Sequence, residues 1–510
     1  AATQTEHQHR NRSAMGIVKR DSIAITVLSY VGVVVGYVNK ILLFPNFLSE
    51  EQVGLTSILV SLAVMYAQFS ALGINSTVVK FFPFFRTADK RHNGLFFWSA
   101  LGVSVGFVLF TALFLIFREP VMHYFAKESP LLSEYYLLLI PLGLATLFYN
   151  FYSAWLQALS RTIISSAVNE VLLRLLITAE ISLYALGVLN FEQFIVGYIA
   201  IYFVPMLILL LYTLYLRESH LHPVITSRTK KLVTIAGIYG LWQYLGGASV
   251  FLTNVIDQTM LAGMEGLMQG GIYAIMMYMV SAMLIPYRSM VKVATPVVTN
   301  LWKERDMAGM QRIHRDVSLM NLIVGCFFFL AIWINLDNIF SLMPASYSAG
   351  RYVFLFLGLG RIFEMYAGLT GVILITSKRY RYDFTFSVLL VGMTVASNAA
   401  LIPSLGMNGA AIATMSTVIV YNLIRIGFVW KFFRIQPFAA TDCWIVLLTG
   451  AMVGLSALIP YLGNFILDAA VRTLVISLLF GATVYYTNAS PQLNATLDGL
   501  LARIGIRLPR

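Results

Sequence analysis

Runs of apolar residues, each long enough to cross a lipid bilayer, alternate with short polar segments along most of the chain. The core of a bilayer requires about 20 apolar residues per helix, so each run predicts one transmembrane helix. We therefore expect an all-α integral membrane protein of about fourteen transmembrane helices. Their predicted ranges are 23–44, 53–73, 95–117, 133–158, 163–186, 193–215, 233–256, 271–291, 317–336, 352–376, 384–402, 408–430, 443–460 and 467–486.

The composition indicates that lipid, not water, surrounds most of the chain. Of 510 residues, 59% are hydrophobic and 11% are charged, whereas a soluble domain carries roughly 25% charged residues. The net charge of +12 comes from short loops between apolar runs, which argues against a nucleic-acid partner. Cys326 and Cys443 lie inside apolar runs, so we expect neither a disulfide nor a metal site. With no phosphate-binding loop or nucleophile elbow in the sequence, we predict no cofactor, no catalytic residue and no enzyme activity.

The distribution of Lys and Arg predicts the topology. If the N-terminus is cytoplasmic, the inner segments hold 26 of the 35 Lys and Arg residues, and the outer loops hold only Arg118 and Lys127. Cytoplasmic loops carry such an excess of positive charge, so we predict a multi-pass protein of the cell inner (plasma) membrane with both termini cytoplasmic. The other seven lie in or at the edges of predicted helices: Lys40, Arg174, Arg288, Arg351, Arg361, Arg425 and Arg472.

A weak internal repeat predicts two lobes. A shift of 217 residues superposes Gln52 on Gln269, Gly143 on Gly360, and Lys40 on Asp257. The two copies are six helices apart, so they share one orientation and predict two parallel six-helix lobes around a central cavity, plus two C-terminal helices. The predicted organisation is a cytoplasmic N-tail 1–22, an N-lobe 23–216, a cytoplasmic linker 217–232, a C-lobe 233–431, two further helices in 443–487 and a cytoplasmic C-tail 488–510.

Three segments resemble a known superfamily. They are Asn254–Asp257 followed by Gln269–Ala274, Pro344–Gly350 before the tenth helix, and Gly406–Ala413 at the start of the twelfth. With two six-helix lobes, they resemble the multidrug/oligosaccharidyl-lipid/polysaccharide exporter superfamily and its polysaccharide branch. The resemblance implies a flippase that moves an oligosaccharide on polyprenyl diphosphate from the inner to the outer leaflet by alternating access. It implies O-antigen, lipopolysaccharide or capsule assembly, with membrane lipids and other polysaccharide-assembly proteins as partners.

Three alternatives stay open at this point. A cation- or proton-coupled multidrug exporter of the same fold would favour an acidic cavity, whereas the predicted buried charge is basic. A lipid II flippase would be expected to carry a basic–acidic pair in its first helix, which here has only Lys40 near its outer end. A membrane enzyme such as a polymerase would require a larger external loop than any predicted here.

Charged and polar residues inside predicted helices are the candidate substrate site, because burying a charge in a membrane is costly. Lys40 and its neighbour Asn39 lie late in the first helix, and Asp257 is the repeat counterpart of Lys40 and its candidate ion-pair partner. Arg288 and Lys292 are four residues apart on one helix face, a spacing that suits a diphosphate. Gln68 and Gln243 are polar groups that a sugar could contact.

Other intramembrane charges have local partners. Glu170 with Arg174, and Arg361 with Glu364, are spaced to form ion pairs on one helix, which favours a structural role. Glu180 has no basic residue one turn away and is the candidate for proton coupling.

Three further expectations concern local structure. All seven histidines fall outside the predicted spans. Segment 293–315 mixes aromatic, methionine and basic residues and predicts an amphipathic helix on the inner membrane surface. Gly32 and Gly36 form a small-residue pattern that indicates close helix packing.

Overall fold

The computed structural model describes residues 25, 27–87, 89–224, 227–490, 493, 494 and 498, and between 227 and 254 it describes side chains only for 233–240 and 244. This part of the chain contains helices and no strand. It forms two compact units. Unit 1 holds the residues up to Val255 and Gly266–Met268, and unit 2 holds Ile256–Glu265 and the residues from Gln269 onward.

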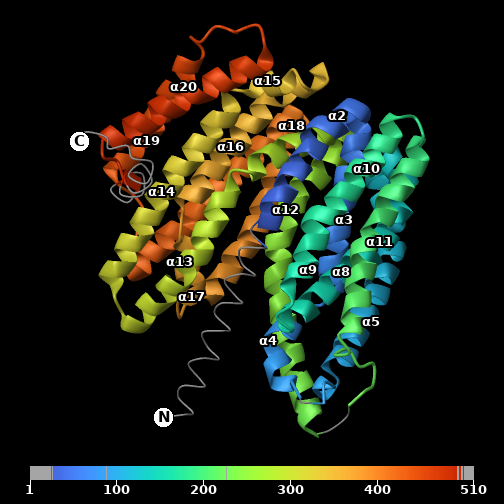
Figure 1. Ribbon diagram of the computed structural model, residues 1–510. Coiled ribbons are helices and arrows are strands. Elements are labelled where there is room, and N and C mark those ends of the chain that lie inside the picture. The colour runs from blue at the N-terminus through green and yellow to red at the C-terminus, as the bar shows by residue number, and fades with distance from the viewer. Residues whose placement is uncertain are drawn as a thin grey trace. The chain divides into compact units, whose positions relative to one another are not determined.

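Unit 1 is a bundle of membrane-length helices, blue to green in Figure 1. Its elements are η1 (Val38–Leu43), α2 (Phe44–Phe47), α3 (Glu50–Ser70), α4 (Ile74–Phe85), η2 (His92–Gly94), α5 (Leu95–Ile116), α6 (Arg118–Ala126), α7 (Pro130–Tyr135), η3 (Tyr136–Leu138), α8 (Leu139–Ala158), α9 (Thr162–Ala167), η4 (Val168–Leu172), α10 (Leu173–Ala185) and α11 (Phe191–Tyr215). The next helix, α12 (Ser227–Ser281), begins in unit 1 and continues into unit 2.

Two capping boxes fix where α3 and α11 begin. Ser49 Oγ accepts a hydrogen bond from the Gln52 backbone N–H, and the Gln52 side chain accepts one from the Ser49 N–H. Asn190 and Gln193 repeat this exchange at the start of α11. Each box satisfies backbone donors that a helix N-terminus leaves unpaired.

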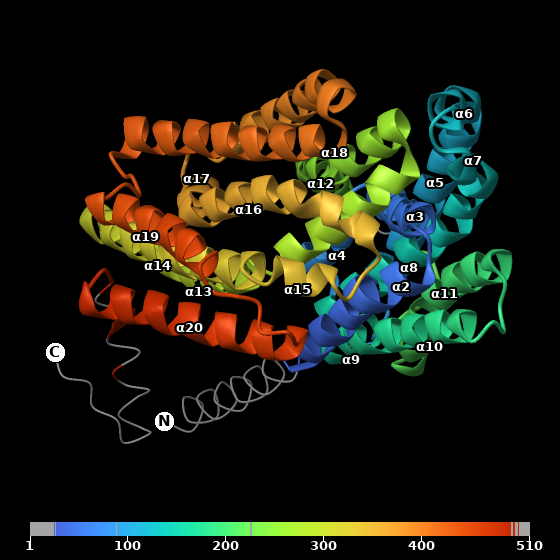
Figure 2. The ribbon, with the colours of Figure 1, turned by 90° about the horizontal axis from the view of Figure 1, so that it is seen from above.

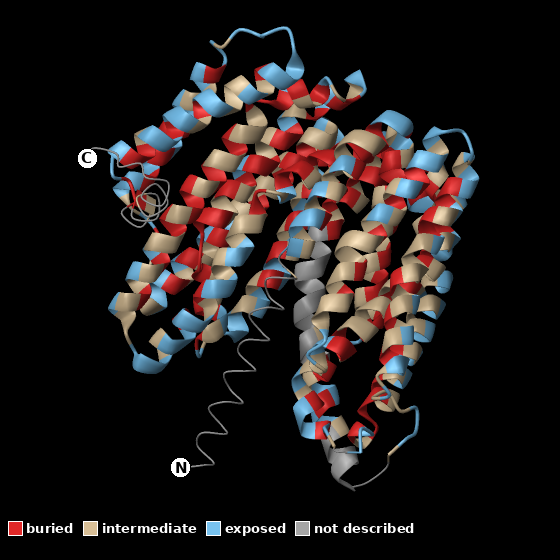
Figure 3. Cartoon of the chain, viewed as in Figure 1, coloured by how far each residue is buried: buried red, intermediate tan, exposed pale blue. Residues whose placement is uncertain are grey.

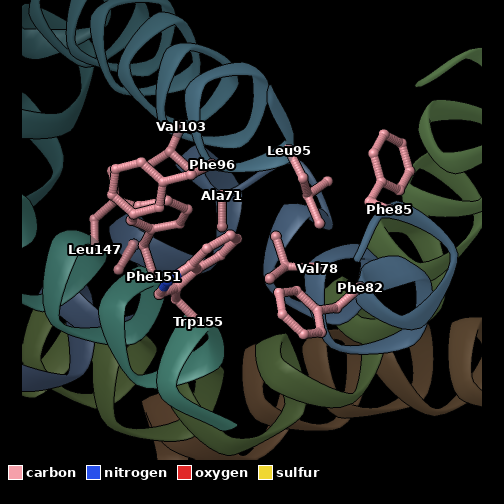
Figure 4. Packing of buried hydrophobic residues seen from close by; sticks show 11 residues of the cluster. Ala71, Val78, Phe82, Phe85, Leu95, Phe96, Val103, Leu147, Phe151 and Trp155 are labelled. Atoms are coloured by element: carbon pink, nitrogen blue, oxygen red, sulfur yellow. The ribbon is translucent and has the colours of Figure 1, made fainter. Parts of the chain in front are cut away.

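The core of unit 1 centres on Trp155 of α8. Its ring packs edge-on against Phe82 of α4, with centroids 5.5 Å apart, and against Phe96 of α5 at 4.9 Å. Figure 4 shows these rings with Val78, Phe85 and Phe151 between the helices that supply them. Large, fully buried aromatic rings therefore hold α4, α5 and α8 together.

Unit 2 is the second helical bundle, yellow to red in Figures 1 and 2. Its elements beyond α12 are α13 (Leu284–Glu304), α14 (Met307–Trp333), α15 (Leu336–Phe340), η5 (Ala345–Gly350), α16 (Arg351–Tyr366), α17 (Thr370–Thr376), α18 (Arg381–Phe433), α19 (Ala440–Ser456) and α20 (Phe465–Tyr486). Helix α14 packs against α16 and also against the two C-terminal helices, α19 and α20.

The longest helices contain kinks at glycine. Helix α12 has extended backbone dihedrals at Gly266 (φ 89°, ψ 170°), and α18 has φ 55° and ψ −135° at Gly406. A positive φ is accessible to glycine at low cost because it has no Cβ. The turn predicted at 404–407 is confirmed by the Gly406 kink, and the predicted gap between the seventh and eighth helices contains Gly266.

By length and composition, nine helices in the described part of the chain could cross a membrane, or eleven if each of two bent pairs is one span. The all-helical membrane fold is confirmed, and the count of fourteen stays a prediction. To reach fourteen, α12 and α18 must each count as two spans divided at the kink, and α19 must count as a span. Figure 3 shows exposed residues along outward-facing helix surfaces. Ile116, Leu186 and Leu458 are at least 70% exposed, as expected for side chains that face lipid.

The sequence-based description differs from the structure in four places. Segment 293–315 is not one amphipathic helix, because α13 runs on to Glu304 and α14 begins at Met307 after a left-handed turn at Arg305. His314 lies inside α14 and is fully buried, so the placement of every histidine outside the spans is wrong. The predicted tenth helix is bent by 49° between α16 and α17, and the eighth by 46° between α12 and α13.

Candidate functional site

Lys40 is a half-buried cation in the first membrane-length helix of unit 1. It lies in η1, a π-helical turn, and such turns often mark functional positions. Its Nζ lies 4.2 Å from the centroid of the Phe44 ring, within the range of a cation–π contact. No carboxylate in the described part of unit 1 forms an ion pair with it.

Asn39 joins the first helix to α10. Its Nδ2 donates to the Arg174 carbonyl oxygen at 2.8 Å, and its Oδ1 accepts from Thr178 Oγ1 at 2.8 Å. The helices approach closely, because a Cβ on Gly32 would lie less than 3.0 Å from the Glu170 carbonyl oxygen. The packing role predicted for Gly32 is therefore confirmed.

The Glu170–Arg174 pair forms as predicted, with Arg174 Nη2 2.7 Å from Glu170 Oε2. Glu170 lies in η4, a second π-helical segment. Both η4 and η1 pack against α10. The pair is neutral overall, so Lys40, the neighbour of Asn39 in the sequence, carries the unbalanced positive charge of η1. Arg174 Nη1 is buried and makes no hydrogen bond. This surplus of cationic donors favours an anionic group as ligand.

Glu180 lies on α10, close to α11. Its side chain is 6% exposed, and Oε2 makes no hydrogen bond. A Cβ on Gly197 would lie less than 3.0 Å from Glu180 Oε1, so only glycine leaves room for the carboxyl group. Among the described residues no cation pairs with this buried carboxyl group, and its role in proton coupling stays a prediction.

Asp257 is the centre of a buried polar cluster in unit 2. Asn398 Nδ2 donates to its Oδ1 at 2.7 Å, and the Thr414 hydroxyl donates to its Oδ2. Tyr273 OH lies 3.4 Å from Thr414 Oγ1. The Asn398 Oδ1 atom is buried without a hydrogen-bond partner. Both carboxylate oxygens of Asp257 therefore accept hydrogen bonds, and the Asn398 Oδ1 atom is the acceptor left open in this cluster.

Arg361 and Glu364 lie on α16 in the same unit and pair as predicted, Nη1 to Oε2 at 2.6 Å. Among the described residues, no group of three or more His, Cys, Asp or Glu side chains could hold a metal ion.

The other predicted binding residues have more open surroundings. Arg288 and Lys292 are both exposed on α13, one turn apart on the face away from buried Ala294 and Val298. Gln68 is half-buried on α3. The side chain of Gln243 lies outside the described residues. The structure therefore joins Asn39 to Arg174, and Arg174 to Glu170, and it pairs Arg361 with Glu364. Among the described residues, no ion pair or hydrogen bond joins Gln68 or the two α13 cations to these groups.

Several polar partners could not be found by sequence reasoning. Asn398 and Thr414 bind a residue more than 140 positions away. Arg425 was noted as an intramembrane cation, but its partner, Asp383 at 2.6 Å, is 42 residues away. No local spacing signals either contact, because both depend on how separate helices pack.

Comparisons with known proteins agree with this fold. A family model described as polysaccharide biosynthesis protein matches residues 18–302. No curated protein matches the chain. Among solved structures, the lipid II flippase MurJ in an inward closed conformation is similar with a TM-score of 0.70 and 13% identity, over 91% of this chain and 99% of that one. An inward-facing multidrug resistance MATE transporter of the MOP superfamily has a TM-score of 0.60 and 15% identity, over 79% and 93% of the two chains.

Proposed function

We propose, from the premise that this chain belongs to the polysaccharide biosynthesis protein family, that it flips a lipid-linked oligosaccharide across the membrane. The substrate would carry a polyprenyl diphosphate and move from the inner to the outer leaflet for cell-surface polysaccharide assembly. The observation that carries the proposal is Lys40, a cation in a membrane-length helix with no carboxylate partner among the described residues of unit 1.

The chemistry of a diphosphate fits this cation. Placing a positive charge in a membrane helix costs about 2.5–3.5 kcal/mol on insertion scales, and an anionic ligand would offset that cost. Phosphate oxygens accept charge-assisted hydrogen bonds, which Lys40 can donate. The buried Nη1 of Arg174, which has no hydrogen-bond partner, is a further donor on the residue whose carbonyl oxygen Asn39 contacts. Outward movement of an anion is further favoured where the membrane interior is negative.

Alternating access between the two units would carry the head group across. The apolar lipid chain would stay in the bilayer, where α19 and α20 add apolar surface to unit 2. The similarity to a lipid II flippase supports a lipid-linked substrate, and lipid II itself is the nearest alternative.

Flipping in proteoliposomes tests the proposal. Vesicles containing only this protein would receive a polyprenyl-diphosphate oligosaccharide with a labelled head group, and an external sugar-modifying enzyme would report its exposure. We expect protein-dependent exposure that falls about tenfold in Lys40→Ala, because one charge-assisted contact is lost. Lys127→Ala is the matched control, since Lys127 is 87% exposed and pairs with Glu128; it should flip at the wild-type rate.

A multidrug exporter of the same fold is the second candidate. The buried carboxyl groups of Glu180 and Asp257 favour it, because they could couple transport to protons or cations. Efflux of a small organic cation driven by a proton or sodium gradient, with no exposure of the labelled oligosaccharide, would replace the flippase proposal. Exposure of lipid II alone would instead establish the lipid II alternative.

A further inference from the structure

A pocket of about 450 Å³ opens at one end of unit 1, outside the clusters described above. Its lining comes from the end of α4, the loop that leads into α5, and the segment after α11: Pro83, Arg86, Thr87, Lys90, His92 and Glu218. The volume lies in the range of small-molecule sites. The pocket is at the membrane boundary of the bundle, because the candidate span of α5 begins at His92.

The pocket is rich in hydrogen-bond donors. Arg86 forms no ion pair with a carboxylate in the described part of the chain, and Lys90 Nζ lies 3.7 Å from Glu218 Oε1. With two cations and one carboxylate, the lining has a net charge of +1 when His92 is neutral.

His92 supplies a third donor. Its side chain is 2% exposed, and its Nδ1 accepts a hydrogen bond from the Thr87 backbone N–H at 3.3 Å. A neutral imidazole that accepts at Nδ1 carries its hydrogen on Nε2. Nε2 makes no hydrogen bond, although Glu218 Oε2 lies 3.4 Å away. A buried N–H that lines a pocket without a hydrogen bond is a position where a ligand oxygen would bind favourably.

Three residues of the loop have an unfavourable backbone conformation. Lys90, His92 and Asn93 all have positive φ, between 47° and 61°. Thr87 Oγ1 accepts from the His92 N–H at 2.9 Å, and Asn93 Nδ2 donates to the Phe85 carbonyl oxygen at 3.0 Å. Such residues cost of order 1–3 kcal/mol each and persist where their surroundings determine them, often at binding sites.

The core beneath the loop fixes the imidazole. The His92 ring centroid lies 4.9 Å from that of Phe82 and 6.1 Å from that of Trp155, two rings that are labelled in Figure 4. The donors of the pocket are therefore preorganised before a ligand arrives, which lowers the entropic cost of binding.

From these observations we propose that the pocket binds a phosphate group, with Arg86, Lys90 and the His92 Nε2–H as donors. The phosphate is either the head group of an anionic phospholipid or a free phosphate ion. Guanidinium and ammonium groups favour phosphate because their hydrogen bonds to it are charge-assisted. Glu218 opposes the anion and orients Lys90. The site acts in binding alone and does not depend on the transport function proposed above.

Binding to the purified full-length chain in detergent tests the site. Two probes would be titrated by calorimetry: dihexanoyl phosphatidylglycerol below its micelle concentration, and inorganic phosphate. We expect saturable binding that weakens about tenfold in Arg86→Gln. Glu218→Gln removes the opposing carboxylate and should tighten binding by about threefold or more. Lys127→Gln changes the net charge by the same amount as Arg86→Gln, away from the pocket, and should leave affinity unchanged.

The outcomes separate the sources and the alternatives. Binding of phosphatidylglycerol alone supports a lipid head-group site, whereas binding of inorganic phosphate as well supports a general phosphate site. Absence of saturable binding for both probes overturns the proposal. Equal weakening in Arg86→Gln and Lys127→Gln overturns it in favour of general surface attraction. Weakening in both Arg86→Gln and Glu218→Gln overturns it in favour of a purely structural loop.

Discussion

Four arginines within the membrane helices have a carboxylate partner, whereas Lys40 has none among the described residues of unit 1. Arg174, Arg361, Arg425 and Arg472 contact Glu170, Glu364, Asp383 and Asp468 at 2.6–2.7 Å. A paired charge is largely neutral toward a ligand, whereas an unpaired one attracts an anion. At the scale of single residues, the missing partner distinguishes Lys40 from these four arginines more clearly than its position in the sequence.

Gly197 determines whether Glu180 can stay buried. In Gly197→Ala the new methyl group would overlap the Glu180 carboxyl group, so we expect a loss of about 1–3 kcal/mol in the free energy of unfolding. Denaturant unfolding in detergent micelles would measure it. Gly237→Ala is the control, because nothing lies within 4 Å of its added Cβ. The double variant Gly197→Ala with Glu180→Ala should regain most of the lost free energy of unfolding. If it does not, overlap with the Glu180 carboxyl group is not the cause of the destabilisation.

Asp89 gives the pocket loop a pH dependence. Hydrogen bonds from the Thr87 hydroxyl and the Arg91 backbone N–H lower the pKa of its carboxyl group below the usual 3.8. Because the pKa is lowered, the ionised carboxylate stabilises the loop at pH values above 3.8. This stabilisation is lost as the pH falls through the lowered pKa. Hydrogen exchange in the loop should be severalfold faster in Asp89→Asn than in wild type at neutral pH. The difference should vanish in acid, and a difference that persists there would show that the charge has no role.

Individual helices are shaped by interactions at their breaks as much as by their apolar length. At the α18 kink, the Gln269 side chain accepts from the Met407 backbone N–H at 2.9 Å and donates to Glu265 at 2.8 Å. The repeat aligned Gln269 with Gln52, but Gln52 caps its own helix whereas Gln269 braces a different one. Residues matched by a repeat can thus have different structural roles.

The kink itself should be sensitive to a single methyl group. Gly406 has a φ of 55°, and an added Cβ would lie less than 3.0 Å from Gln269 Oε1. The backbone at φ 55° and ψ −135° is adopted almost only by glycine and costs other residues of order 1–3 kcal/mol, so Gly406→Ala should lower the free energy of unfolding by at least that amount. Gly427→Ala in the same helix has open space around its Cβ and serves as the control. If Gly406→Ala and Gly427→Ala are equally stable in denaturant unfolding, α18 can form without the kink at residue 406.

At the scale of the whole molecule, the two C-terminal helices are integral to unit 2. Asn338 donates to Asp468 of α20 at 2.7 Å, and Tyr366 OH donates to Asp442 of α19 at 2.7 Å. In Figure 2, α19 and α20 lie beside α14, and they pack against it. These buried hydrogen bonds fix both helices to the bundle.

Removing both contacts should loosen this attachment. When Asp442 and Asp468 are both replaced by Ala, the donors of Tyr366 and Asn338 lose their acceptors. Each buried donor left without a partner costs about 1–3 kcal/mol, so we expect a lower thermal unfolding temperature. If α19 and α20 support a lipid-linked substrate, flipping of the labelled oligosaccharide should fall more than efflux of a small cation. Cys443→Ser, on the exposed side of α19, is the control. Unchanged flipping despite lower stability would separate these helices from substrate handling.

The sequence by itself determined the helical membrane fold, the turns near Ser160 and Gly406, and the ion pairs of Glu170 and Arg361. These features follow from one-dimensional rules, because bilayer thickness sets apolar length and helix geometry sets the spacing of local pairs. The two-unit division found in the structure begins unit 2 at Ile256, later than the predicted boundary, since the first part of α12 packs on α4. There Lys80 Nζ lies 3.7 Å from the centroid of the Tyr239 ring.

Only the tertiary structure decided which distant polar groups meet. Asp257 bonds with Asn398 and Thr414, Arg425 with Asp383, and His314 lies between Ser318 and Thr370. A buried polar group must find a partner, but the sequence does not specify which helix supplies it. That choice depends on how helices pack, and close contacts such as that of Gly197 with Glu180 are set by three-dimensional fit.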